Sequence, residues 1–75
     1  MLKYTTSDFY CAVALIAYGE ILIDIDRADE RRYMFIFEHT DSLNNIASRY
    51  WERTLDIKVH EFISAQKFLK SRMYN

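Results

Sequence analysis

The fold is decided by the stretch Arg31-Arg32-Tyr33-Met34-Phe35-Ile36-Phe37-Glu38. Its β-branched and aromatic content predicts a strand, and alternate side chains point to opposite faces. Both faces are apolar: Tyr33, Phe35 and Phe37 point one way, Met34 and Ile36 the other. Such a strand is either covered on both sides or offers one side to a partner. The sequence leaves both possibilities open.

The preceding segment, Glu20–Arg27, alternates apolar and acidic residues and predicts a hairpin partner for this strand. A three-residue turn, Ala28–Glu30, would pair Ile25 with Tyr33, Ile23 with Phe35 and Ile21 with Phe37, and would set Asp26 opposite Arg32. A four-residue turn would instead set Asp24 and Asp26 beside Phe35 and Tyr33. We expect the first register, because it collects one wholly apolar face.

The first helix is expected to begin in Thr5-Thr6-Ser7-Asp8, where a threonine cap is followed three residues later by an acid. It should run to Tyr18 and end at Gly19, the only glycine in the chain. This helix would carry apolar residues on nearly all of its sides, which predicts that more than one side is buried. One stripe comprises Phe9, Ala12, Val13 and Ile16, and Tyr10, Ala14 and Tyr18 continue round the helix.

Two further helices are expected. Thr40 or Asp41 should cap a helix that ends near Arg53, with Leu43, Ile46, Ala47, Tyr50 and Thr54 inside. The segment Leu55–Val59 alternates and is a possible short strand. The last helix should span His60–Tyr74 and turn Phe62, Ile63, Gln66, Leu69 and Met73 inward, with Ser64, Ala65 and Phe68 on a second side.

These elements predict one α+β domain over residues 1–75, with an antiparallel hairpin at the centre of its sheet and three helices. If the short segment Met1–Tyr4 is also a strand, the order becomes β-α-β-β-α-β. That is the split order of ferredoxin-like and RNA-recognition-motif folds, with three to four strands in the sheet.

Composition narrows the function. Hydrophobic residues make up 51% of the 75 residues and aromatic residues 16%, which favours a packed core. A net charge of −1 argues against a protein that coats nucleic acid, although a local basic patch remains possible.

The single cysteine, Cys11, excludes a disulfide framework and a cysteine-based zinc site, and favours the reducing cytoplasm. The longest apolar run, Phe9–Tyr18, is too short to span a membrane, and we expect no signal peptide.

Chemical motifs are weak. The decisive strand faintly echoes the RNA-recognition-motif signature, in which aromatic residues stack on bases, but core packing of these aromatics is the simpler interpretation. Asp24 and Asp26 lie on one side of a strand and are expected to be solvated edge acids that pair with Arg32. His39 and His60 share no ligand spacing with Cys11, and no serine has a nucleophile-elbow context. We therefore expect no enzyme and no catalytic, cofactor or metal site.

Two sets of residues are candidates for binding. Exposed aromatic residues are typical of protein interfaces, and Trp51 between arginines is a good example. The candidate protein interface comprises Tyr10, Tyr18, Phe68 and Trp51. Cations near the end of the last helix either complement the helix dipole or meet phosphate. The candidate nucleic-acid surface comprises Arg31, Arg32, Lys67, Lys70 and Arg72.

The ends of the chain resemble those of an uncharacterised family of small prokaryotic and phage domains. The matching residues are Tyr4, Thr6, Asp8, Tyr10 and Ala12 at the start, and Leu69, Lys70, Ser71, Arg72 and Tyr74 at the end. Gly19, the strand Arg32–Phe37 and Phe62 fit as well, so the likeness covers nearly the whole chain. The resemblance implies a viral or mobile-element setting and carries no known activity.

The sequence therefore predicts a small non-enzymatic accessory protein that acts by contact with a protein partner, and a second copy of the chain is a candidate for that partner. So short a chain carries more apolar surface than it can cover by itself. Nucleic-acid binding through the basic residues is the first alternative. Inhibition of a host defence complex, with Asp24, Asp26, Asp29 and Glu30 imitating nucleic acid, is the second.

Overall fold

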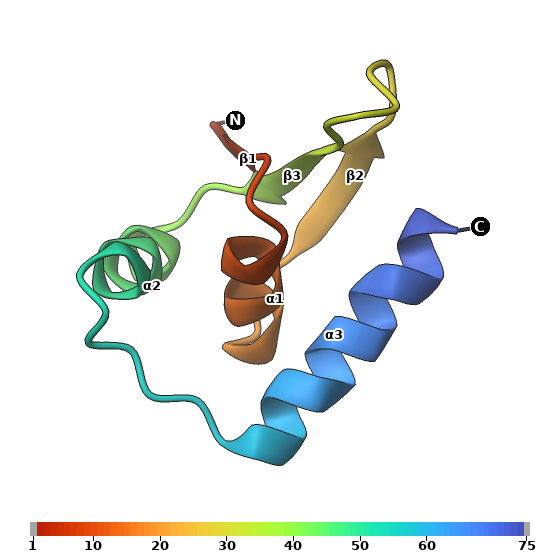
Figure 1. Ribbon diagram of the computed structural model, residues 1–75. Coiled ribbons are helices and arrows are strands. Elements are labelled where there is room, and N and C mark those ends of the chain that lie inside the picture. The colour runs from red at the N-terminus through yellow and green to blue at the C-terminus, as the bar shows by residue number, and fades with distance from the viewer. Residues whose placement is uncertain (1, 75) are drawn as a thin grey trace.

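The computed structural model describes residues 2–74 and confirms the α+β class, with three helices and a three-stranded antiparallel sheet (Figure 1). Met1, which was assigned to the first predicted strand, lies outside the described residues. The elements in chain order are β1 (Lys3–Thr6), α1 (Phe9–Ala17), β2 (Leu22–Asp26), β3 (Met34–Glu38), α2 (Asp41–Trp51) and α3 (Val59–Met73).

The strand order is β1-β3-β2, so β3 lies between two strands that α1 connects. The predicted ferredoxin-like order is confirmed in part: the three strands have the split arrangement, but the described residues contain no fourth strand. Within residues 2–74 the segment 55–58 forms no strand, and Val59 already belongs to α3. Alternation alone misled the prediction here, because a strand also needs a neighbour with which to pair.

The start of the chain differs from the prediction in its use of threonines. Thr5 and Thr6 extend β1, where they pair with Ile36 and Phe35. The helix cap is Asp8, whose Oδ1 accepts a hydrogen bond from the backbone N–H of Cys11 at 2.9 Å. A carboxylate at this position satisfies one of the free N–H groups of the first turn. The predicted threonine cap was therefore wrong.

Neither predicted hairpin register is correct throughout. Near the turn Asp24, Ile25 and Asp26 pair with Ile36, Phe35 and Met34, and residues 27–33 form a longer loop. A bulge between Leu22 and Asp24 shifts the pairing. Its result is that Ile25 is buried while Ile23 remains 40% exposed. Asp26 consequently faces Met34 rather than Arg32.

The aromatic side of β3 is core. Phe35 and Phe37 are 2% and 0% exposed and pack with the buried Cys11–Leu15 segment of α1. Burying one phenylalanine stabilises the fold by roughly 1.5–3 kcal/mol. These two rings cannot stack on bases, so the core interpretation of the strand is confirmed. Figure 1 shows α1 in the middle, with α2 and α3 on either side of it and the sheet behind.

The opposite face of the sheet is more polar and less buried. Thr5, Ile36 and Asp24 form one row across the three strands. Ile36 and Met34 are only half-buried, whereas Thr5 and Asp24 are exposed. The helices that cover the aromatic side leave this second face open to solvent.

The outer helices confirm most of their predicted inner stripes. Thr40 caps α2 by accepting a hydrogen bond from the Leu43 N–H at 3.0 Å, and Leu43, Ile46 and Ala47 are buried as expected. Thr54 lies beyond the end of α2 and is exposed. In α3 the buried residues are Ala65 and Leu69, whereas Ile63, which was predicted to point inward, is 40% exposed.

Candidate functional site

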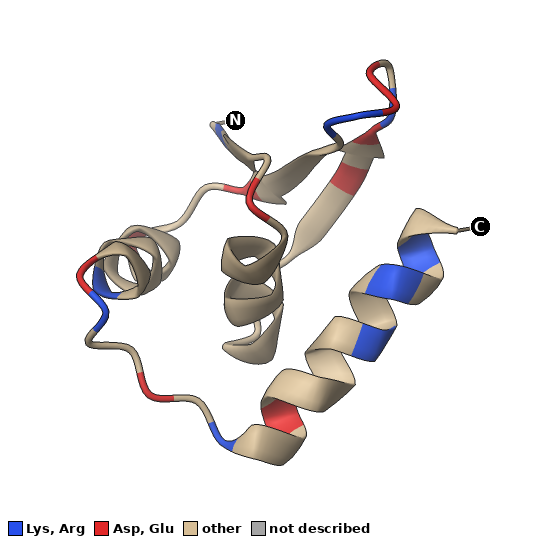
Figure 2. Cartoon of the chain, viewed as in Figure 1, with Lys and Arg blue, Asp and Glu red and all other residues tan. Residues whose placement is uncertain are grey.

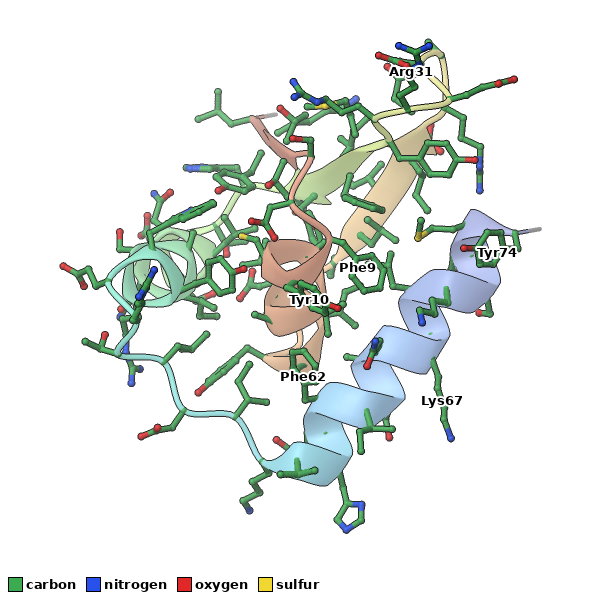
Figure 3. All side chains as sticks on the ribbon, in the orientation of Figure 1. Phe9, Tyr10, Arg31, Phe62, Lys67 and Tyr74 are labelled. Atoms are coloured by element: carbon green, nitrogen blue, oxygen red, sulfur yellow. The ribbon has the colours of Figure 1, made fainter. Side chains whose placement is uncertain are left out.

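The side of α1 that faces away from the sheet carries Tyr10, Ala14 and Tyr18. These residues are four apart and so lie above one another on the helix. Tyr10 is 54% exposed and stacks on Phe62 of α3, with ring centres 6.3 Å apart and planes 17° apart (Figure 3). Tyr18 is 40% exposed, and its hydroxyl donates to the carbonyl oxygen of Asp56. Two exposed tyrosines are thus held in place by neighbouring segments.

A hollow of about 410 Å³ lies along this side of α1, and its lining comes from α1, α2, α3 and the α2–α3 connection. We call it the α1 hollow. Most of its lining is apolar or aromatic, and its one charged group is a guanidinium. The residues that line it are Ala14, Tyr50, Arg53, Leu55, Ile57 and Phe62. A concave surface with apolar walls and a few polar groups is typical of binding sites.

The one arginine of the hollow has an unusual backbone. Arg53 has φ 63°, the left-handed region that residues with a Cβ adopt at a cost. It follows the C-terminus of α2, where its N–H donates to the Tyr50 carbonyl at 3.1 Å and the Thr54 N–H donates to the Arg49 carbonyl at 3.0 Å. This pair of bonds is a Schellman motif, which usually has glycine at the left-handed position.

The wall of the hollow that α2 supplies is tied to the start of α1. The Tyr50 hydroxyl donates to Oδ1 of Asp8 at 3.2 Å, so the cap of α1 also holds α2. Burial raises the pKa of Tyr50 to about 12, and the charge of Asp8 adds to this shift. Burial likewise raises the pKa of the Cys11 thiol, again with help from Asp8. Cys11 is therefore kept as a buried, protonated thiol.

The four residues predicted as a protein interface are all exposed, but they lie on different elements. Tyr10 and Tyr18 lie one turn to either side of Ala14, which lines the α1 hollow. Phe68 is 46% exposed and lies in a groove of about 450 Å³ that it shares with Ile16 and Ala17. Trp51 is 59% exposed and packs edge-on against Tyr50, with ring centres 5.1 Å apart. The structure thus brings Tyr10 and Tyr18 together and leaves the other two apart.

The five residues of the predicted nucleic-acid surface are all exposed and fall into two groups. Arg31 and Arg32 lie on the β2–β3 loop, whereas Lys67, Lys70 and Arg72 lie in the C-terminal half of α3 (Figure 2). Figure 3 shows Arg31 and Lys67 well separated. Arg72 lies over the ring of Phe68, with its guanidinium carbon 6.0 Å from the ring centre.

The acidic residues of β2 and its loop bind backbone groups next to them. Oδ1 of Asp24 accepts from the N–H of Ile25 at 2.8 Å, Asp26 accepts from Ala28 at 2.9 Å and Asp29 accepts from Arg31 at 2.9 Å. Asp24 and Asp26 are exposed, as predicted, but each uses an oxygen to stabilise the local turn or edge.

Metal-ligating side chains are scattered. Within residues 2–74, no three His, Cys, Asp or Glu side chains lie together in a way that could hold a metal ion. His39 bonds to the Asn44 side chain at 2.9 Å, and His60 is exposed near the start of α3. No helix in the described part of the chain is long and apolar enough to cross a membrane.

Comparison with known proteins places the chain in a family. A family model with the description "Domain of unknown function (DUF5659)" matches residues 1–75. The chain belongs to this family. The resemblance to an uncharacterised family is thereby confirmed over the full length. Searches of curated proteins and of solved structures give no match.

Sequence reasoning missed most of the lining of the α1 hollow. Leu55 and Ile57 were interpreted as part of a possible short strand, but they lie in the α2–α3 connection and are half-buried against the hollow. Arg53 was noted only as an arginine beside Trp51, and its left-handed backbone carried no signal, because glycine is the residue usually found at that position. The spacing of Tyr10, Ala14 and Tyr18 was the one local pattern that pointed to this surface.

Proposed function

We propose that this protein is a binding module that acts by contact with another protein through the side of α1 that carries Tyr10 and Tyr18. The observation that carries this proposal is the α1 hollow, an open concave surface with exposed tyrosines beside it. Tyrosine and arginine are the residues that most often dominate binding energy at protein interfaces. Here Tyr10, Tyr18 and Arg53 are available for that role.

The strain at Arg53 supports the same surface. A left-handed non-glycine residue costs about 1–2 kcal/mol, and such residues gather at functional sites. Glycine would form the same Schellman motif without that cost. The arginine side chain lines the hollow, where it can hold a carboxylate or a carbonyl group of a partner.

We propose a second copy of this chain as the partner. A standard interface covers about 800 Å² on each partner, which is about 15% of the 5378 Å² of accessible surface. The exposed large apolar side chains are spread over several elements and can meet that need. Apart from Tyr74, which lies at the end of α3 and outside the proposed contact, they are Leu2, Tyr10, Tyr18, Ile21, Ile23, Trp51, Val59, Ile63 and Phe68. In a two-fold interface Phe68 of one copy can face a different patch of the other.

Sedimentation of the purified protein over a range of concentrations tests this proposal. We expect a reversible dimer at high micromolar concentration. The variant Tyr10→Glu should shift the equilibrium toward monomer at least tenfold, because it places a charge in the apolar contact. Tyr74→Glu is the matched control, since Tyr74 is even more exposed, at 77%, and lies at the end of α3. A wild-type monomer at every concentration would refute the homodimer.

The biological setting is also a proposal. We propose a non-enzymatic accessory protein of a phage or mobile element that works in the cytoplasm. The support is the resemblance at the two ends of the chain, together with the buried free thiol of Cys11, which suits a reducing compartment. Expression of the protein during phage replication, followed by isolation of its complexes, tests this setting. Recovery of the protein only from secreted fractions would contradict it.

A further inference from the structure

A second pocket lies on another part of the molecule, where the β2–β3 loop meets the start of α1 and the end of α3. Its volume is about 530 Å³, within the range of small-molecule sites. It shares no lining residue with the α1 hollow, so the two pockets are separate. The residues that line it are Ser7, Phe9, Glu30, Arg31, Arg32, Tyr33, Phe35, Met73 and Tyr74. We call it the arginine pocket.

The walls of the arginine pocket are joined to each other. The guanidinium of Arg27 donates through Nη2 to the carbonyl of Arg72 and through Nε to that of Met73, at 3.4 Å for Met73. These carbonyls belong to the last turn of α3, which has free acceptors. The same guanidinium lies 5.9 Å from the ring centre of Tyr33. Arg27 therefore fastens the loop to the helix and positions one aromatic wall.

The loop presents two arginines in succession. Its turn is held by Asp29, whose side chain accepts from the N–H of Arg31 at 2.9 Å and whose carbonyl accepts from that of Arg32 at 3.1 Å. Both arginines are exposed. Glu30 also lines the pocket, so the three adjacent charges sum to about +1. A planar guanidinium is well suited to bind the oxygens of a phosphate in pairs.

The remaining lining is aromatic. Phe9 and Tyr33 are half-buried and Tyr74 is 77% exposed, while the buried Phe35 contacts Phe9 edge-on with ring centres 6.4 Å apart. Figure 3 shows Arg31, Phe9 and Tyr74 on three different elements around this part of the molecule. Flat rings beside cations are the combination on which proteins stack nucleobases. An acidic peptide would need the arginines but not this aromatic lining.

We propose that the arginine pocket binds an aromatic base that carries a phosphate. Arg31 and Arg32 hold the phosphate, and the base lies against Tyr33, Phe9 and Tyr74. Two sources supply this chemistry, a free nucleoside phosphate and the phosphorylated end of a single strand. The site differs from an RNA-recognition-motif platform, because the central rings of β3 are buried and stacking uses residues outside the strand.

Calorimetric titration of the full chain with four probes tests the proposal: AMP, adenosine, inorganic phosphate and a 5′-phosphorylated oligothymidine. AMP should bind at least tenfold more tightly than adenosine or phosphate alone, because only AMP uses both parts of the site. If the oligothymidine binds at least tenfold more tightly than AMP, the ligand is the phosphorylated end of a nucleic-acid strand. The reverse order would assign the site to free nucleotides. Affinity should fall as salt is added.

Matched variants locate the site. Arg31→Ala and Arg32→Ala should each weaken AMP binding at least tenfold. Lys67→Ala removes another exposed cation, one that does not line the pocket, and should change AMP affinity less than twofold. Tyr74→Ala should weaken the binding of AMP but leave the binding of inorganic phosphate unchanged. The arginine substitutions lie on an exposed loop, and thermal unfolding will verify that the fold is kept. Failure of all four probes to bind at millimolar concentration, or equal losses in the Arg31 and Lys67 variants, would overturn the proposal.

Discussion

The ends of α1 and α2 use the same hydrogen-bond motif with different residues at its centre. After α1 the N–H of Gly19 donates to Ile16 at 2.9 Å and that of Glu20 donates to Leu15 at 3.0 Å. After α2 the corresponding central residue is Arg53. Gly19 has φ 87° and Arg53 has φ 63°, so both are left-handed. At the first end a glycine adopts the left-handed backbone without strain, whereas the second end carries a strained residue whose side chain lines the α1 hollow.

The largest effect is expected from Gly19→Val. A β-branched residue resists the left-handed region, and the loss of unfolding free energy should be about 2 kcal/mol. A Cβ at this position would meet no atom within 4 Å, so the loss arises from backbone strain and not from a clash. Urea denaturation measures it. Gly19→Asn should lose less, since asparagine tolerates this region. Equal losses for Val and Asn would contradict the strain argument.

At the end of α2 we expect a substitution to increase stability. Arg53→Gly relieves the same kind of strain and should raise the unfolding free energy by about 0.5–1 kcal/mol, after the entropy of glycine in the unfolded chain is counted. It should also weaken self-association, because the guanidinium leaves the hollow. Arg53→Lys is the control that keeps both the strain and the charge. A loss of stability in Arg53→Gly would show that the arginine side chain stabilises the fold.

A third test concerns the residue that supports the end of α2. Tyr50→Phe removes the hydrogen bond to Asp8 and should cost about 1 kcal/mol. The pKa of Tyr50 is raised to about 12 from an unfolded value of 10.0, so the folded state retains this proton longer. The stabilisation is complete below pH 10 and is lost as the pH rises toward 12. Tyr50→Phe should therefore show a flatter decline of stability in this range, which denaturation at stepped pH measures.

The smallest change in stability is expected from substitution of Glu20, the residue after Gly19. The two carboxylate oxygens of Glu20 accept from the hydroxyls of Thr40 and Ser42, each at 2.7 Å, and so tie the end of α1 to the start of α2. Glu20→Gln replaces one acceptor with a donor and should cost about 0.5 kcal/mol. Denaturation in low and high salt checks it, because part of this contribution comes from the charge near the α2 N-terminus. A salt-independent difference would exclude the dipole contribution.

The sequence predicted the features that depend on neighbouring residues and missed those that depend on residues far apart in the chain. Gly19 was placed correctly because only glycine is favoured at a left-handed helix end, and the buried α1 followed from its apolar residues. The hairpin register was not predictable, since no residue in the local sequence marks the bulge between Leu22 and Asp24. The segment that begins at Leu55 has the alternating pattern of a strand, but among the described residues no strand pairs with it.

The candidate sites were predictable to a lesser degree. Tyr10 and Tyr18 share a helix face, which spacing reveals. The arginine pocket joins Phe9, Arg31 and Tyr74, which are far apart in the chain, and no local pattern indicates that they meet. The prediction did single out Arg31 and Arg32 as cations, but it grouped them with Lys67, which the fold places elsewhere.

The carboxylate of Asp24 limits how copies of this chain can aggregate. Because it occupies the N–H of Ile25 on an edge strand, β2 offers an incomplete ladder to any further strand, and the neighbouring acid Asp26 repels a second β2. If copies ever join by strand addition, β1 is the remaining border of the sheet. One usable border per molecule allows pairs but no endless stacks, so crowding should give discrete particles rather than fibres.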